Sequence, residues 1–270
     1  MGTRMKNAPI CFALAQVRFN PILTLDQFLP TIQDSLRKAG FPDFQKVFLA
    51  TINLNLGNQP VAETPVSALS VPQTRYRFMD AAKHSGFVLN QSFLAFETTH
   101  YDTFEPFLAA FVLGLETVHN AADLNFSERI GVRFLDAVLP KQGEDVTRYL
   151  SPAVVGLVGQ LSDRDLVHSI SETRTELNKT VLVSRAIVYK LAQKGDVGFP
   201  PDLQHQLKLM DKFTNVKEGL YAMIDTDSWY EERNPFDLHE IERHFVKLHD
   251  DIGRSFGLMV SDHALKTWND

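Results

Sequence analysis

Arginines at alternating positions are the side chains of this sequence best placed to bind a ligand. Side chains two or four residues apart project from the same face of a β-strand. Arg75 and Arg77 have that spacing, as do Arg129 and Arg133, and Arg18 stands in a Val-Arg-Phe triplet that recurs at Arg133. If these faces converge, they form a surface that receives a carboxylate, a phosphate or an acidic segment of a partner protein.

The alternative role for these arginines is structural. Each would then form an ion pair across the sheet with an acidic residue such as Glu97, Glu128 or Asp136. Cross-strand ion pairs are common, and most of them contribute little to stability. Loss of binding without unfolding, after reversal of the charge at Arg77 or Arg133, would distinguish a ligand surface from such pairs.

Two acids and a histidine form a second group of candidates. Asp225 and Asp227 share one face of a predicted strand, where two carboxylates can hold a hard cation or carry out acid–base chemistry. Turn or capping chemistry between this strand and the next helix is the alternative, and we favour it. His249 lies on the predicted C-terminal helix. With Arg133 and the two acids, it is a candidate to line a pocket between the helices and the sheet.

The sequence lacks the common catalytic and metal-binding motifs. His239 and His244 are five residues apart, so they do not share the helix face that a zinc protease requires. There is no nucleophile elbow, no phosphate-binding glycine loop and no dinucleotide fingerprint. Cys11 is the single cysteine, and we expect it to be buried as a small apolar residue. We therefore predict no catalytic residue, no metal and no cofactor.

The composition is that of an ordinary soluble protein. Of 270 residues, 44% are apolar and 22% are charged, enough for one large domain or two small ones. The net charge of -6 argues against broad nucleic-acid binding, which needs a basic face. No apolar run approaches the length of a membrane span. Because one thiol cannot form an internal disulfide, we expect a cytoplasmic protein.

Periodicity and turn signals predict alternating strands and helices. We expect strands at 10–19, 46–55, 74–80, 86–90, 93–101, 128–139, 168–178, 180–191 and 219–230. The predicted helices begin near Thr24, Phe104 and Asp237, with a further one over 145–160. Residues 56–74 and 193–216 contain many breakers and are interpreted as loops, the second with one short helix.

The order of these elements is similar in the two halves of the chain. The segment 16–19 (Gln-Val-Arg-Phe) matches 131–134 (Gly-Val-Arg-Phe), and 97–99 (Glu-Thr-Thr) is similar to 225–227 (Asp-Thr-Asp). We therefore predict an α+β fold, with a largely antiparallel, curved sheet built from βαβββα halves at 1–125 and 126–270. Two long helices would pack on one face of that sheet. Coincidental repetition of a common pattern remains the alternative to duplication.

The strand predicted over 168–178 is polar on both faces. Such a strand is expected at an edge of the sheet or on an open face, because neither side offers an apolar surface to bury. An exposed edge is a place where a segment of a partner protein can add as a further strand.

Several motifs along the chain resemble a sporadically distributed family of uncharacterised prokaryotic proteins of about this length. The resemblance rests on segments at 17–21 (Val-Arg-Phe-Asn-Pro), 75–78 (Arg-Tyr-Arg-Phe), 97–101 (Glu-Thr-Thr-x-Tyr), 129–134 (Arg-Ile-Gly-Val-Arg-Phe) and 248–256 (Leu-His-x-x-Ile-x-x-x-Phe). The family more often has Gly-Leu-Arg-Tyr at the place of 131–134, so a hydroxyl is lost here. It implies no catalytic residue. Its patchy distribution is typical of accessory proteins of phage-defence, CRISPR-linked or toxin–antitoxin loci.

These observations lead to three hypotheses of function. The first is a non-enzymatic, cytoplasmic protein that binds a protein partner, within a bacterial defence module. The second is a small-ligand-binding protein or enzyme with its pocket between the long helices and the sheet. The third is sequence-specific nucleic-acid binding, which rests only on the scattered arginines. Failure of the protein to retain any nucleic acid at low salt would exclude this hypothesis.

Overall fold

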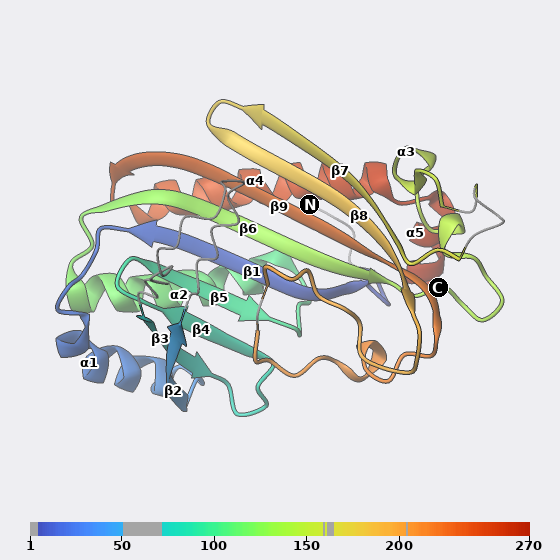
Figure 1. Cartoon of the computed structure of the whole chain (residues 1–270). Helices are drawn as coiled ribbons and strands as arrows, with labels where there is room; N and C mark the ends of the chain where they lie inside the picture. The colour runs from blue at the N-terminus through green and yellow to red at the C-terminus, as the bar shows by residue number, and fades with distance from the viewer. Residues whose placement is uncertain (1–4, 51–71, 159, 161–164, 204) are drawn as a thin grey trace, which may run out of the picture.

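One open antiparallel sheet passes through both halves of the chain in the computed structural model, which describes residues 5–50, 72–158, 160, 165–203 and 205–270 (Figure 1). Its strand order is β2-β3-β4-β5-β1-β6-β9-β8-β7. The strands are β1 (Ile10–Phe19), β2 (Asp43–Ala50), β3 (Pro72–Met79), β4 (Ser85–Leu89), β5 (Phe93–Thr98), β6 (Phe126–Val138), β7 (His168–Leu177), β8 (Thr180–Leu191) and β9 (Gly219–Pro235). The helices are α1 (Leu25–Lys38), α2 (Phe104–Ala122), α3 (Pro152–Val155), α4 (Leu238–Met259) and α5 (Asp262–Asn269).

The α+β class and the antiparallel sheet confirm the coarse prediction of the fold. From the central pair outward, the order is β1-β5-β4-β3-β2 in one direction and β6-β9-β8-β7 in the other, so the last strand of each half returns beside the first. The two local sequence matches do not share one register. When Arg18 is placed on Arg133, Glu97 falls at the position of Glu231 and not of Asp225. Duplication of a half therefore stays a prediction.

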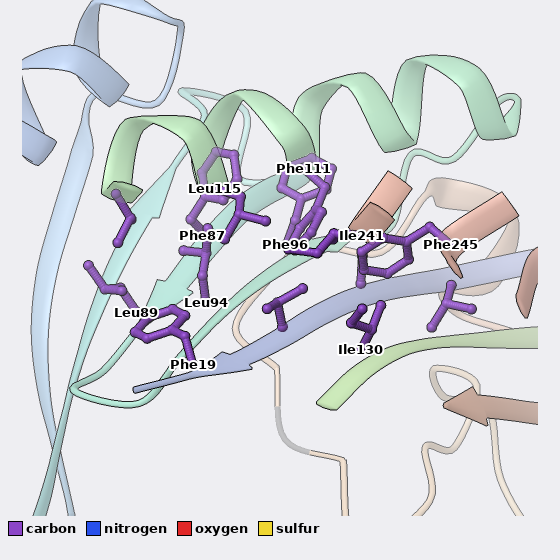
Figure 2. Packing of buried hydrophobic residues seen from close by; sticks show 14 of the residues in the cluster. Phe19, Phe87, Leu89, Leu94, Phe96, Phe111, Leu115, Ile130, Ile241 and Phe245 are labelled. Carbon is purple, nitrogen blue, oxygen red and sulfur yellow. The ribbon is translucent and has the colours of Figure 1, made fainter. Parts of the chain in front are cut away.

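The main hydrophobic core joins alternate side chains of the strands to α1, α2 and α4. Figure 2 shows Phe111 of α2 beside Phe96 of β5 and Phe245 of α4. The ring centroids of Phe111 and Phe245 are 4.9 Å apart. Gly114 permits the close approach of α2, because a Cβ there would come within 2.1 Å of the Phe87 ring. We refer to the side of the sheet that meets this cluster as the core side.

The opposite side of the sheet is partly covered by the insertion 192–218. Apolar residues of this segment, including Val197 and Phe213, pack against Phe12 and Leu135 of the central strands. The insertion contains one short 3₁₀ helix, η2 (Asp211–Phe213), as the sequence predicts. It covers the end of the sheet where β1 and β9 begin, and no described segment covers the other end of this side, which we call the open end.

The helix predicted over 145–160 is wrong. The chain instead forms a 3₁₀ turn, η1 (Val146–Arg148), and the four-residue α3. Ser151 is extended before Pro152, since a residue that precedes proline avoids the helical region, and it caps α3 at the Ala153 N–H. Gly156 then leaves the helix with a φ of 61°. The predicted loop at 56–74 lies largely outside the described residues.

The C-terminal helix α4 ends at Met259, where its apolar pattern also ends. Val260 is extended, and Ser261 caps α5 by accepting a hydrogen bond from the Ala264 N–H at 3.1 Å. The short α5, which the sequence analysis does not anticipate, places Trp268 against Tyr149 and Phe256. Among the described residues, no helix combines the length and the apolar character needed to cross a bilayer.

The polar strand of the second half lies at an edge of the sheet, as predicted. β7 pairs only with β8, and its side chains are exposed along most of its length. Its charged residues Glu172, Arg174 and Glu176 stand at alternating positions, which is how natural proteins discourage unwanted pairing at an edge. Addition of a partner strand here stays a prediction.

The apolar stripe of α4 divides into a fully buried part and a partly exposed end. Phe245 is 0% exposed, whereas Phe256 is only partly buried. Replacement of Phe245 by alanine should cost about 3–5 kcal/mol of the free energy of unfolding, because it removes a buried ring and leaves a cavity. The Phe256→Ala variant should lose less than half of that in the same urea titration. Equal losses would show that the two rings are equally buried.

Candidate functional site

The five candidate arginines all project from the side of the sheet opposite the core. In β6, Ile130, Val132 and Phe134 enter the core, so Arg129 and Arg133 point the other way. The same alternation places three further arginines on that side: Arg18, Arg75 and Arg77. We refer to this side, on which all five candidate arginines lie, as the arginine face. The five candidate arginines therefore lie on one common side of the sheet, and they differ in the residues that surround them.

Arg133 belongs to a buried ion-pair network at the covered end of the arginine face. Its Nε and Nη2 each donate to the Asp225 carboxylate at 2.8 Å, and Nη1 donates to Asp202 of the insertion at 2.7 Å. Arg185 of β8 approaches Asp225 from the other side, with Nη1 3.1 Å from Oδ2, and also contacts Glu172. Three carboxylates surround the two arginines of this network, so it stabilises the sheet and leaves neither arginine free to bind an anionic ligand.

Arg75 and Arg77 form a second, less complete group. Arg77 Nη1 lies 3.8 Å from Glu97 Oε2, and the buried Nε atoms of both arginines have no hydrogen-bond partner among the described residues. Burial raises the pKa of Glu97 to about 7, although both arginines oppose this. Burial also lowers the pKa of Arg75, and the neighbouring Arg77 adds to the effect. This group is therefore short of hydrogen-bond acceptors.

Arg18 and Arg129 lie directly opposite each other in the ladder between β1 and β6. Arg18 is exposed, and Arg129 is half-buried, donating to Gln16 at 3.2 Å and lying 4.9 Å above the Trp229 ring. Neither arginine forms an ion pair with a described residue. Burial lowers the pKa of Arg129, and Arg18 lowers it further, although Asp227 and Glu231 oppose this. Two like charges face each other here, and the acids that act on Arg129 are Asp227 and Glu231, the latter directly opposite it on β9.

The expected structural partners of the arginines are correct in one case of three. Glu97 does lie beside Arg77. Glu128 instead pairs with Arg233, at 2.5 Å. Asp136 lines the core side and has no ion pair with any described residue. Alternation along β6 could have excluded this last pairing, because Asp136 is two residues from Phe134 and three from Arg133.

Asp225 and Asp227 do share one face of β9, as the sequence predicts. Turn or capping chemistry does not explain them, however, because β9 continues to Pro235. Asp225 is fully buried between two arginines, and burial raises the pKa of Asp227. Within the described part of the chain, no three potential ligands gather closely enough to hold a metal ion.

His249 lies on the core side of the sheet and is separated from the other candidates. Its ring stacks on Phe104 with centroids 3.9 Å apart, and burial lowers its pKa. It lines a pocket between α2 and α4, and so does Asp136. The hypothesis of one pocket lined jointly by Arg133, Asp225, Asp227 and His249 is therefore wrong, because the sheet lies between His249 and the other three.

Asp136 is the residue in this pocket that the sequence analysis misjudged. It is 7% exposed, and it pairs through its backbone with Ile10 and Ile224. Burial raises the pKa of its carboxyl to about 7. Its charge acts on the Tyr101 phenol and the Cys11 thiol and helps to raise the pKa of each, and neither group supplies a positive charge.

The buried network makes a prediction about two acids that share Arg133. Asp225→Asn should cost about 3–5 kcal/mol, because it leaves two arginines without their buried counterion. Asp202→Asn should cost less than about 1 kcal/mol, since the Asp202 side chain is 65% exposed. Chemical denaturation of both variants measures the difference. Similar losses would contradict the assignment of Asp225 as the centre of the network.

Asp136 makes a prediction about pH. Its folded-state pKa of about 7 lies above the ordinary 3.8, so the ionised carboxyl destabilises the fold at pH values above both. Asp136→Asn removes that penalty and should stabilise the protein by ~1–4 kcal/mol at about pH 8. The gain should shrink as the pH falls through 7 and vanish near 4, where both forms are neutral. Denaturation curves across this range test it, and a pH-independent difference would contradict it.

Comparisons with known proteins identify no relative of this chain. No family model matches it, and no curated protein is significantly similar to it. The resemblance to a sporadically distributed prokaryotic family therefore stays a prediction. Function has to be inferred from the residues and their placement.

Proposed function

We propose that the protein is a non-enzymatic binding protein that captures an acidic segment of a partner protein on the open end of the arginine face. The observation that carries this proposal is the direct opposition of Arg18 and Arg129 across β1 and β6. Like charges in directly opposed positions of a ladder destabilise a sheet. An anionic ligand removes the repulsion and supplies a counter-charge to Arg18, since the nearby acids Asp227 and Glu231 act on Arg129.

The surroundings of the two arginines favour a carboxylate-bearing peptide. Arg18 also lies opposite Phe93. The guanidinium carbon of Arg75 lies over the Phe93 ring, 5.6 Å from its centroid. The row from β3 to β6 therefore presents three cations and an aromatic ring, on strands spaced about 4.8 Å apart. Arginine guanidinium groups bind carboxylates through paired, planar hydrogen bonds. An extended acidic segment that crosses the strands could engage them in succession.

Trp229 supplies the apolar contact that a protein partner needs. The guanidinium groups of Arg129 and Arg174 lie over its ring at 4.9 and 5.3 Å. Gly131 lies opposite Trp229, and a Cβ at that position would come within 3.3 Å of the Trp229 Cβ. Partly exposed tryptophan flanked by arginine is the composition typical of an interface centre.

The charge distribution favours an acidic peptide over nucleic acid as the ligand. A duplex needs many cations to neutralise its phosphates, whereas the open end of this face offers few, in a chain with a net charge of -6. We also propose that the two long helices pack on the core side of the sheet and that the two halves of the chain arose by duplication. The resemblance noted above suggests a setting, that of a cytoplasmic accessory protein of a bacterial defence locus.

Removal of Arg18 should separate binding from stability. Arg18→Gln should weaken the binding of a fluorescent heptaglutamate peptide about 10-fold, equivalent to ~1.4 kcal/mol, and Arg129→Gln should do the same. The free energy of unfolding of Arg18→Gln should stay unchanged or rise, since a like-charge contact disappears. Fluorescence anisotropy and urea denaturation measure the two effects.

Arg37→Gln is the matched control, because Arg37 is an exposed arginine of α1 that pairs locally with Asp34. It should leave peptide binding unchanged. A protein from the native host retained by the wild type and by Arg37→Gln, and lost from Arg18→Gln, would be the partner. Equal binding of heptaglutamate by wild type and Arg18→Gln, or no preference for it over heptaglutamine, would contradict the proposal. A preference for oligonucleotides over heptaglutamate would do the same.

A further inference from the structure

The core side of the sheet carries a pocket of about 880 Å³ between α2 and α4. Its walls are mainly apolar side chains of the two helices, such as Leu108, Val112 and Val246, and its inner end is formed by Phe134 and Asp136 of β6. This volume lies within the range of small-molecule sites, which are largely apolar with a few polar groups.

Asp136 is the buried polar group of this pocket. Its neighbours along β6, Phe134 and Val138, are apolar, and so are Ile10 and Ile224 on the adjoining strands. Among the described residues its carboxyl has no hydrogen-bond donor and no cation. A buried carboxylate without a partner destabilises a fold, so its position at the inner end of a pocket is informative.

Aromatic rings line the same pocket as Asp136. Tyr101 lies 5.2 Å from Phe134 between ring centroids, and His249 lies 5.9 Å from Phe134 while stacking on Phe104. All four rings line the pocket. Faces of aromatic rings attract organic ammonium groups, and cages of such rings are used to bind them. Burial also lowers the pKa of His249, which favours its neutral form beside a cation.

The other charged side chains among the described lining residues have the same sign as Asp136. None of its described lining residues is lysine or arginine, and its acidic members include Glu105, Glu116, Glu242 and Asp250. Charge therefore selects against an anionic ligand and in favour of a cation at both the rim and the inner end.

We propose that this pocket binds a small organic ammonium compound, with its apolar body between α2 and α4 and its ammonium group at Asp136 within the ring of Tyr101, Phe104, Phe134 and His249. The site lies on the other side of the sheet from Arg18 and Arg129. It is therefore independent of the proposed protein-binding function.

Three probes with one apolar body test this inference. Phenylbutylamine, phenylbutanol and phenylbutyrate carry a cation, a neutral hydroxyl and an anion on the same scaffold. Isothermal titration calorimetry on the full chain should show that the amine binds at least about 10-fold more tightly than the alcohol, and that the acid binds most weakly. No binding of the amine, or equal affinities for amine and alcohol, would overturn the proposal.

Two variants and a matched control locate the site. Asp136→Asn should lose the preference for the amine while keeping the affinity for the alcohol. Val112→Trp, which fills the pocket from α2, should abolish binding of both. Asp251→Asn removes an α4 carboxylate outside the pocket and should bind like the wild type, as should Arg18→Gln. Retention of tight amine binding by both Asp136→Asn and Val112→Trp would overturn the proposal, even if one of the variants were less stable.

Discussion

The antiparallel ladder between β1 and β6 holds the two halves of the chain in one sheet, and its register assigns the side chains of both strands to a face. Val17 and Val132 enter the core, so Arg18 and Arg133 must project from the opposite side. A slip of one residue would exchange the two sets and bury the arginines among the helices. Burial of the apolar side chains in the core is therefore sufficient to place the arginines together on the opposite face of the sheet.

Helices and strands with a strong apolar periodicity could be predicted from the sequence, whereas the residues that surround them in the fold could not. The stripes of α2 and α4 and the alternation of β6 indicate which side chains are buried, because that depends on local spacing alone. The position of His249 relative to Asp225 depends instead on which side of the sheet α4 covers, and local spacing says nothing about this. The helix predicted over 145–160 was wrong because an apolar period outweighed Pro152 and Gly156, whose backbone preferences interrupt the chain.

The Val-Arg-Phe triplets show how far the same local sequence can diverge in role. Arg133 lies under the insertion and is matched by Asp225 and Asp202, whereas Arg18 stands on the open end opposite another arginine. The difference arises from Asp202, which is distant in sequence and reaches Arg133 only because the insertion folds over one end of the sheet. Reversal of the charge at Arg133 would therefore disrupt the fold before it reported on binding. The exposed Arg18 is the better probe.

The arginine pair Arg18 and Arg129 and the acid Asp136 carry charges of opposite sign on opposite sides of the sheet. Arg18 and Arg129 repel each other, and Asp136 lies in apolar surroundings with no hydrogen-bond donor in the described part of the chain. Each arrangement lowers the stability of the isolated chain, and a glutamine at position 18 or an asparagine at position 136 would relieve it without changing the shape of the fold. Residues that oppose folding and are easily replaced are best explained by what they bind, since stability is commonly given up where function requires it.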